Sequence, residues 1–261
     1  MERIVGVLAD DFGVISRAGL AEAEAGHTDN LAAYDCVLRS YGYVDRVSPA
    51  EHLAVRACLE EAVALDPTYA EAWGSLALMH QDEYLFGFNP RPDAGDPLAR
   101  AIAASRKAIE ADAASQIGHQ LMATAHYFAG DLEQFRVAAE RALSLNPNNL
   151  NSLATLGFFT VNAGDWDRGI ALMDKAVALN PNHPKWYHIP YTARHYRDAN
   201  YDAALLSAKR FNQPGFYWHH VWLAMIYAQL GRLDEARASI AELNSLYPGY
   251  ADVAHADIEL W

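Results

Sequence analysis

Apolar and polar positions recur along this chain with helical spacing, in blocks of about 34 residues. In the block 116–149, one apolar stripe precedes the turn at Gly130 and a second stripe follows it. Prolines end the last blocks at 34-, 33- and 34-residue intervals, at Pro147, Pro181, Pro214 and Pro248. Proline cannot continue a helix, so each one ends a helical stretch. A fixed period of this length predicts a stack of helical hairpins.

Small residues stand beside large apolar ones on the same predicted helix faces. Ala123, Ala142, Gly157 and Ala176 are examples, with leucine and methionine nearby. Small side chains let neighbouring helices approach closely while the larger ones fill the remaining space. The pattern therefore predicts tight packing between successive helices.

The block 150–183 repeats this arrangement, with Leu156-Gly157 in its first helix and Gly164 in its turn. The pattern resembles the tetratricopeptide repeat, in which a Trp-x-x-Leu-Gly-x-x-Tyr helix precedes Ala-x-x-x-Phe and a closing proline. The resemblance is strong over 116–183 and good over 48–67 and 217–250. It implies an all-α fold, a right-handed superhelical solenoid of about six helical hairpins. The predicted units are 30–67, 70–113, 116–149, 150–183, 184–214 and 217–250, with a helical segment and linker over 1–29 and a capping helix over 251–261.

Two units depart from the pattern. In the unit that begins at Ala70, the second helix is expected only at 98–111, after an insertion over 84–97 that contains Phe86 and Phe88. We expect these two rings to fasten the insertion onto the helix ends, in preference to forming a lid over a groove, because exposed paired phenylalanines are costly in water. In the unit 184–214, Pro190 is expected to kink or open its helix.

The stretch from Ala33 to Arg39, joined to Ser48-Pro49-Ala50-Glu51, resembles the start of the tetratricopeptide tail in large bacterial sensor and regulator proteins, including some adenylate cyclases. That resemblance implies a C-terminal piece of such a protein or a stand-alone relative. Recognisable cyclase residues are lacking, so the cyclase activity is not transferred.

Composition narrows the class of partner. The chain has 261 residues and a formal net charge of −13, and an acidic surface disfavours binding to nucleic acid. Cys36 and Cys58 fall on apolar helix faces without zinc-type spacing, which favours small core residues in a reducing compartment. The apolar run at the start of the chain is too short for a signal peptide, and charged residues follow it too soon. No apolar run of the sequence is long enough to span a membrane. We therefore expect a cytoplasmic protein that does not bind membranes.

Motifs for catalysis are lacking in the sequence. It has no phosphate-binding Gly-x-x-x-x-Gly-Lys, no Gly-x-Ser-x-Gly and no His-Glu-x-x-His. His188 and His195 are seven residues apart, which puts their rings about 10 Å apart along a helix, too far for one metal ion. We expect no catalysis, no metal and no cofactor, and histidines that hydrogen-bond and give binding a mild pH dependence.

The first helix of each hairpin lines the concave side of such arrays, so its outward residues define a candidate groove. Ala154, Val221 and Met225 belong to this lining by their spacing. The candidate binding residues are Gln120, Thr124, Tyr127, Asn151, Phe158, Asn162, His188, Thr192, His195 and Trp218. Lysine and arginine are nearly missing from this lining, which argues against a clamp for a terminal carboxylate.

A neutral lining of amides and aromatic rings suits an extended peptide. The predicted function is therefore a protein- or peptide-binding scaffold in a bacterial regulatory assembly, the assembly being implied by the resemblance. One alternative is a small-molecule sensor around His188, His195 and Trp218. Another is a helical-hairpin enzyme with a concave acidic site, which the scarcity of acids in the predicted groove disfavours. The oligomeric state is left open.

Overall fold

The computed structural model describes residues 32–44 and 47–260, and over these residues it is helical with no strand. Its α-helices are α3 (Ala32–Tyr43), α4 (Pro49–Leu65), α5 (Ala70–Phe86), α6 (Pro97–Ala111), α7 (Gln116–Phe128), α8 (Leu132–Leu145), α9 (Leu150–Asn162), α10 (Trp166–Leu179), α11 (His188–Arg197), α12 (Tyr201–Phe211), α13 (Tyr217–Gln229), α14 (Leu233–Leu246) and α15 (Tyr250–Leu260). Two short 3-10 turns, η2 (Pro92–Ala94) and η3 (Lys185–Tyr187), interrupt the series. The predicted all-α fold class is confirmed.

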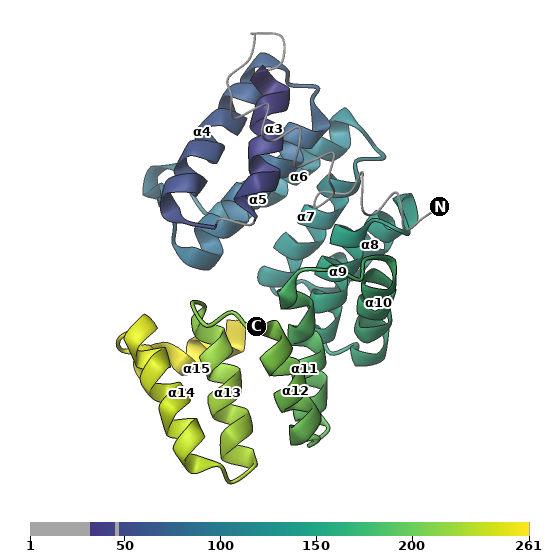
Figure 1. Ribbon diagram of the computed structural model, residues 1–261. Helices are drawn as coiled ribbons and strands as arrows, with labels where there is room; N and C mark the ends of the chain where they lie inside the picture. Colours follow the sequence, from purple (N-terminus) through teal and green to yellow (C-terminus); the bar gives the residue numbers. More distant parts are fainter. Residues whose placement is uncertain (1–31, 45–46, 261) are drawn as a thin grey trace. The chain divides into compact units, whose positions relative to one another are not determined.

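Consecutive helices pair as hairpins, α3 with α4 through α13 with α14, and each predicted unit contains one such pair (Figure 1). The prolines at the ends of the last four units each follow a second helix; Pro147, for example, comes two residues after α8 ends. Gly130 has φ 77° in the turn between α7 and α8, a backbone conformation that favours glycine. The predicted segment 1–29 lies outside the described residues.

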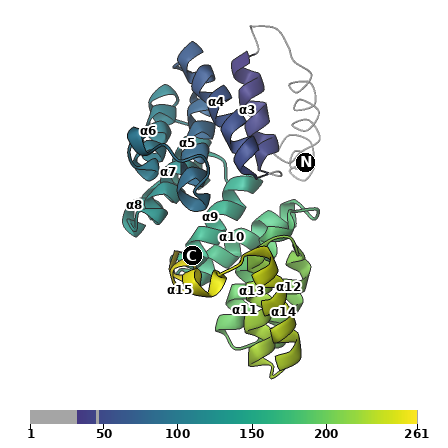
Figure 2. The same cartoon turned by 90° about the vertical axis from the view of Figure 1, so that its left-hand side faces the viewer.

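The chain divides into two compact units, residues 1–156 and 157–261, and α9 contributes residues to both. Within unit 1, α5 packs against α6 and α7 as well as against α3 and α4. Within unit 2, the hairpins α11–α12 and α13–α14 lie side by side (Figure 2). Packing between sequence neighbours of this kind is what a helical repeat requires, because each hairpin buries its apolar face only against the next one.

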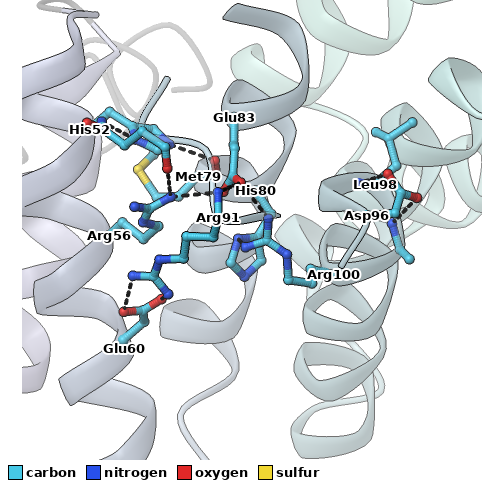
Figure 3. Close-up of polar contacts among 12 residues, drawn as sticks. His52, Arg56, Glu60, Met79, His80, Glu83, Arg91, Asp96, Leu98 and Arg100 are labelled. Atoms are coloured by element: carbon cyan, nitrogen blue, oxygen red, sulfur yellow. Dashed lines mark hydrogen bonds and ion pairs between the residues drawn. The ribbon is translucent and has the colours of Figure 1, made fainter. Parts of the chain in front are cut away.

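The insertion after α5 is held by buried polar contacts rather than by its phenylalanine rings alone (Figure 3). Glu83 near the end of α5 is 5% exposed and accepts three hydrogen bonds. Its Oε2 accepts from Arg56 Nη1 of α4 at 2.9 Å, and its Oε1 accepts from Arg100 Nη2 of α6 at 2.6 Å and from the Arg91 backbone N–H at 3.0 Å. One carboxylate thus joins α4, α5, α6 and the insertion.

Two more residues attach the insertion to α4. Asn89, in the left-handed conformation at φ 46°, donates from Nδ2 to the Pro49 carbonyl at 2.7 Å and contacts His52 Nδ1 at 3.0 Å. Arg91 pairs with both oxygens of Glu60 at 2.6 and 2.8 Å. The Phe88 ring meets His52 edge-on at 5.8 Å, as expected of a ring that fastens the insertion. Phe86 differs from that expectation, because it is the last residue of α5 and is 43% exposed.

Pro190 does not kink its helix, contrary to the sequence-based prediction. The helix α11 begins at His188, after the turn η3, so Pro190 stands in its first turn. The first four N–H groups of a helix have no acceptor within the helix, and a proline there removes none of its hydrogen bonds. The shortened hairpin accommodates the proline by starting late.

Cys36 and Cys58 are joined as a disulfide between α3 and α4, with Cα atoms 5.4 Å apart, so the prediction of two unpaired core cysteines is wrong. Cys36 is buried and Cys58 is half-buried, in agreement with apolar helix faces. Sequence spacing did not reveal the pair because the two residues come together only when α3 and α4 fold back on each other. Disulfides persist mainly in oxidising environments, which removes one basis for expecting a reducing compartment.

Replacing Glu83 tests whether its carboxylate stabilises unit 1. In Glu83→Gln, the Arg56 guanidinium, whose side chain is 2% exposed, loses its ion pair with Glu83, and we expect unfolding to become easier by about 3–5 kcal/mol. Urea denaturation followed by circular dichroism measures the difference. Glu110→Gln is the control, because Glu110 pairs with Lys107 in solvent and its loss changes stability by less than about 1 kcal/mol. Equal midpoints for both variants would refute the role given to Glu83.

Asp82 gives unit 1 a pH-dependent stability. Burial raises the pKa of Asp82 from 3.8 to about 7, although Tyr43 Oη donates to its Oδ2 at 2.7 Å. Between these two pH values the folded protein keeps a proton that the unfolded chain has lost. The free energy of unfolding therefore falls as pH rises through this window, by an upper limit on the order of 4 kcal/mol, and levels off above about pH 7.

Asp82→Asn removes this titration while keeping an acceptor for Tyr43. We expect the variant to lose the fall in stability between about pH 4 and 7, relative to the wild type, and to be the more stable of the two at pH 8. Urea midpoints across this range measure it, and parallel curves for the two proteins would contradict the assignment.

Candidate functional site

In unit 1, two of the predicted groove residues are internal. Thr124 Oγ1 of α7 donates to Gln81 Oε1 of α5 at 2.7 Å, and Thr124 is 2% exposed. Gln120 is 6% exposed, and its Oε1 accepts a hydrogen bond from Ser152 Oγ of α9 at 2.5 Å. These side chains join successive first helices to each other, so the positions predicted for a ligand serve helix packing instead.

The other two residues of unit 1 that were predicted to line the groove, Tyr127 and Asn151, are half-buried. Tyr127 packs edge-on against Phe128 and Phe135 at 5.3 and 5.8 Å between ring centres. Asn151 Oδ1 accepts a hydrogen bond from Thr155 Oγ1 on the same helix at 3.2 Å. Neither contact brings the residue into a shared pocket with the others.

In unit 2, a pocket of about 440 Å³ opens between the first helices of successive hairpins. Three of the predicted residues, Phe158, Asn162 and Trp218, line it, together with Met225, which the spacing also put on the groove. The remaining lining residues, which were not predicted as site residues, are Trp166, Ile189, Pro190, Ala193, Phe216, Trp222 and Ile258. The pocket therefore has walls from α9, α11, α13 and α15, with Trp166 at the start of α10 and Phe216 just before α13.

The predicted histidines do not line this pocket. His188 is half-buried beside His183, at 5.1 Å between ring centres, and burial followed by His183 and Arg210 lowers the pKa of His188. Thr192 is 1% exposed and donates to the carbonyl of His188 at 2.9 Å. His195 is half-buried outside the lining, and the predicted Val221 is 5% exposed within the core of unit 2.

Close helix contact positions one wall of the pocket. A Cβ on Gly169 of α10 would lie 2.7 Å from the Gly157 carbonyl and 2.6 Å from the Val161 nitrogen, both in α9. This approach holds Phe158 and Asn162 at the end of α9 next to Trp166, whose ring is covered by the Arg197 guanidinium at 4.7 Å. Gly157, which the sequence predicts to permit close packing, thus also shapes the pocket, together with Gly169.

The lining carries no formal charge, and Asn162 is its only amide. Its many aromatic faces provide apolar contact area of the kind that ligand sites use, and the volume falls in their usual range of about 300–1,000 Å³. The described residues contain no group of three or more metal-ligating side chains. The arrangement suits the binding of an uncharged apolar group.

Two features of the sequence pointed to some of the residues that line this pocket, but not to all of them. Trp218 and Trp222 are four residues apart and share a helix face, and the aromatic enrichment over 186–222 marked the region. Trp166 and Ile258 carried no such signal, because one is the first residue of a second helix and the other lies in the helix predicted as a cap.

The comparisons with known proteins agree with this architecture. A tetratricopeptide repeat family model matches residues 220–250, which include most of α13 and the whole of α14. The fold of the described chain is thus that of a tetratricopeptide repeat protein. No curated protein matches the sequence. A bilayer-spanning stretch is absent from the helices of the described residues.

Solved structures show the same fold at low identity. The chain is similar to a structure reported in a functional characterisation of pilF from Pseudomonas aeruginosa, with a TM-score of 0.58, 19% identity, and coverage of 88% of this chain and 98% of that chain. A tetratricopeptide repeat protein from Parabacteroides merdae gives a TM-score of 0.52 at 16% identity, covering 88% and 89%. The human IFIT1 dimer with m7Gppp-AAAA gives 0.65 at 15% identity, covering 83% of this chain and 51% of that chain.

Substitution of Gly169 tests the helix contact that shapes the pocket. Gly169→Ala forces α10 away from α9 because its Cβ would overlap backbone atoms, and we expect a loss of about 1–3 kcal/mol in the stability of unit 2. Thermal melting measures it, with Gly215→Ala as the control, since a Cβ there meets nothing within 4 Å. A Gly169→Ala protein as stable as the control would show that the contact is looser than described.

Proposed function

We propose that this protein is an interaction scaffold and that the unit 2 pocket accepts apolar side chains of a partner protein. The tetratricopeptide fold supports a role in protein interaction in general. The observation that carries the finer proposal is the uncharged, aromatic-rich pocket built from several successive hairpins. Interfaces concentrate their binding energy in such desolvated pockets, where a few large apolar anchors dominate.

A peptide segment suits this site better than the sensor arrangement suggested by the sequence. That alternative placed His188 and His195 around Trp218, and neither histidine lines the pocket. The volume of about 440 Å³ still fits a small apolar molecule, so this remains the second candidate. An enzymatic role finds no support in the lining, which offers no acid, base or nucleophile.

The regulatory assembly, the cellular compartment and the class of partner are also proposals. The expected place in a bacterial regulatory assembly rests on resemblance, and the disulfide weighs against the reducing compartment from which a cytoplasmic location was inferred. The predicted lack of nucleic-acid binding rests on net charge, and the IFIT1 structure shows that this fold is also found with m7Gppp-AAAA.

A random peptide library provides a test with a defined readout. We expect peptides selected on the wild-type protein to share large apolar residues and to bind Trp218→Ala at least about tenfold more weakly, because the pocket loses a wall. His188→Ala is the matched control from the same predicted set and should bind like the wild type. Affinities are measured by fluorescence anisotropy, and melting curves show that the variants remain folded.

Met225→Ala provides a second pocket variant in case Trp218→Ala unfolds. Unchanged affinity in both pocket variants would remove the pocket from the proposal. If selection yields no peptide while a library of small apolar compounds raises the melting temperature of the wild type but not of Met225→Ala, the small-molecule candidate replaces the peptide.

A further inference from the structure

The part of α15 that reaches the unit 2 pocket has little apolar packing of its own. The start of the helix is well packed, because Tyr250 is 4% exposed and belongs to an apolar cluster with residues of α13 and α14 (Figure 1). Beyond it, residues 251–258 are exposed apart from Ala254 and Asp257, which are half-buried. Ile258 lines the pocket and is 49% exposed. The turn that carries Ile258 therefore depends on other contacts to keep its place.

A carboxylate next to Ile258 supplies such a contact. Asp257 Oδ1 accepts a hydrogen bond from Tyr217 Oη of α13 at 3.0 Å, and Asp257 Oδ2 accepts one from Tyr250 Oη at 3.0 Å. Because both oxygens are used, the two bonds fix the orientation of the carboxylate. Only the bond from Tyr217 ties this end of α15 to another helix. We call Asp257, Tyr217 and Tyr250 the α15 latch.

The two hydroxyl donors of the latch are held in place by their rings. The rings of Tyr217, Tyr247 and Tyr250 contact one another at 5.4–5.6 Å between centres. Burial, followed by the Asp257 carboxylate, raises the pKa of both Tyr217 and Tyr250, so their hydroxyls stay protonated and able to donate. Hydrogen bonds to a carboxylate are stronger than those between neutral groups. The latch is therefore suited to hold the turn that carries Ile258.

The latch and the pocket are coupled because Asp257 and Ile258 are adjacent in α15. When the carboxylate is held, the backbone that carries the isoleucine is held with it. The walls from α11 and α13 have a different support, since each of these helices packs against the second helix of its own hairpin. Ile258 is thus a lining residue whose place depends on a polar contact.

We propose that Asp257 and Tyr217 position Ile258 so that it closes one side of the unit 2 pocket over a bound apolar group. This role rests on the function proposed for the pocket and adds how the pocket retains what it binds. Both are positioning residues, because neither belongs to the lining. Loss of the latch frees Ile258 and lets the bound group leave sooner.

The test follows binding of prodan, an uncharged fluorescent naphthalene, to the full chain by stopped-flow fluorescence. Tyr217→Phe removes one hydroxyl and keeps the ring. We expect it to raise the dissociation rate constant about threefold to tenfold and to leave the association rate constant close to that of the wild type. Tyr191→Phe is the matched control, because Tyr191 Oη also donates to an aspartate, Asp174, at 2.9 Å, and Tyr191 does not line the pocket. It should bind prodan like the wild type.

A double-mutant cycle separates positioning of Ile258 from a general loss of stability. In an Ile258→Ala background, Tyr217→Phe should change the dissociation rate constant no further, because the side chain that the latch positions is gone. In an Asn162→Ala background, which alters the wall from α9, Tyr217→Phe should still raise it by the same factor as in the wild type. Equal effects of Tyr217→Phe in both backgrounds would overturn the proposal.

Hydrogen exchange without ligand, measured by mass spectrometry, tests the latch separately from binding. We expect the amides of residues 251–258 to exchange about tenfold faster in Tyr217→Phe than in the wild type or in Tyr191→Phe. Unchanged exchange, with prodan binding that is lost in Trp218→Ala, would refute the latch and leave the function proposed for the pocket standing. Faster exchange in a protein that does not bind prodan would refute the pocket function, and with it the retention by Ile258.

Discussion

Close contact between successive helices is the constraint on which this structure depends. One hairpin cannot bury both of its apolar faces, so each is stabilised by its neighbour. The contact between α9 and α10 at Gly157 and Gly169 is so close that a side chain at either position would crowd atoms of the other helix. Ala62, Ala142 and Ala176 are each at most 1% exposed and occupy equivalent positions near the ends of second helices. Small residues at these points set the distance at which all other side chains pack.

Polar side chains supplement this apolar packing in unit 1. Ser40 bonds to Ser75, Thr124 to Gln81 and Ser152 to Gln120, each pair joining two first helices. Buried polar groups must be paired to avoid a desolvation cost, so these contacts favour one register between neighbouring helices. Unit 2 uses its first helices differently, since their facing side chains are largely apolar and leave a pocket. The same repeat thus provides a polar seam in one unit and an apolar site in the other.

The insertion and the short hairpin show how a repeat tolerates irregularity. The segment 87–96 between α5 and α6 is accommodated because one buried carboxylate, Glu83, accepts hydrogen bonds from three segments. Pro190 is accommodated by delaying the start of α11. In both cases the neighbouring hairpins keep their contacts, since each depends only on adjacent elements. An irregular position can also form part of a binding site, because Pro190 lines the unit 2 pocket.

The sequence by itself determined the helices, their pairing and the tetratricopeptide class, because periodic apolar positions, turn glycines and closing prolines act locally. Gly130, for example, marks the turn between α7 and α8, and Pro147 follows the end of α8. It also put Phe158, Asn162 and Trp218 on the candidate groove, and these three residues line the unit 2 pocket. Tertiary structure alone decided that Gln120 and Thr124 face another helix, that Cys36 meets Cys58, and that Ile258 joins Trp166 at one pocket. Those contacts join residues that are tens of positions apart, and helical periodicity gives the face of a helix without saying which neighbour, or which opening, that face meets.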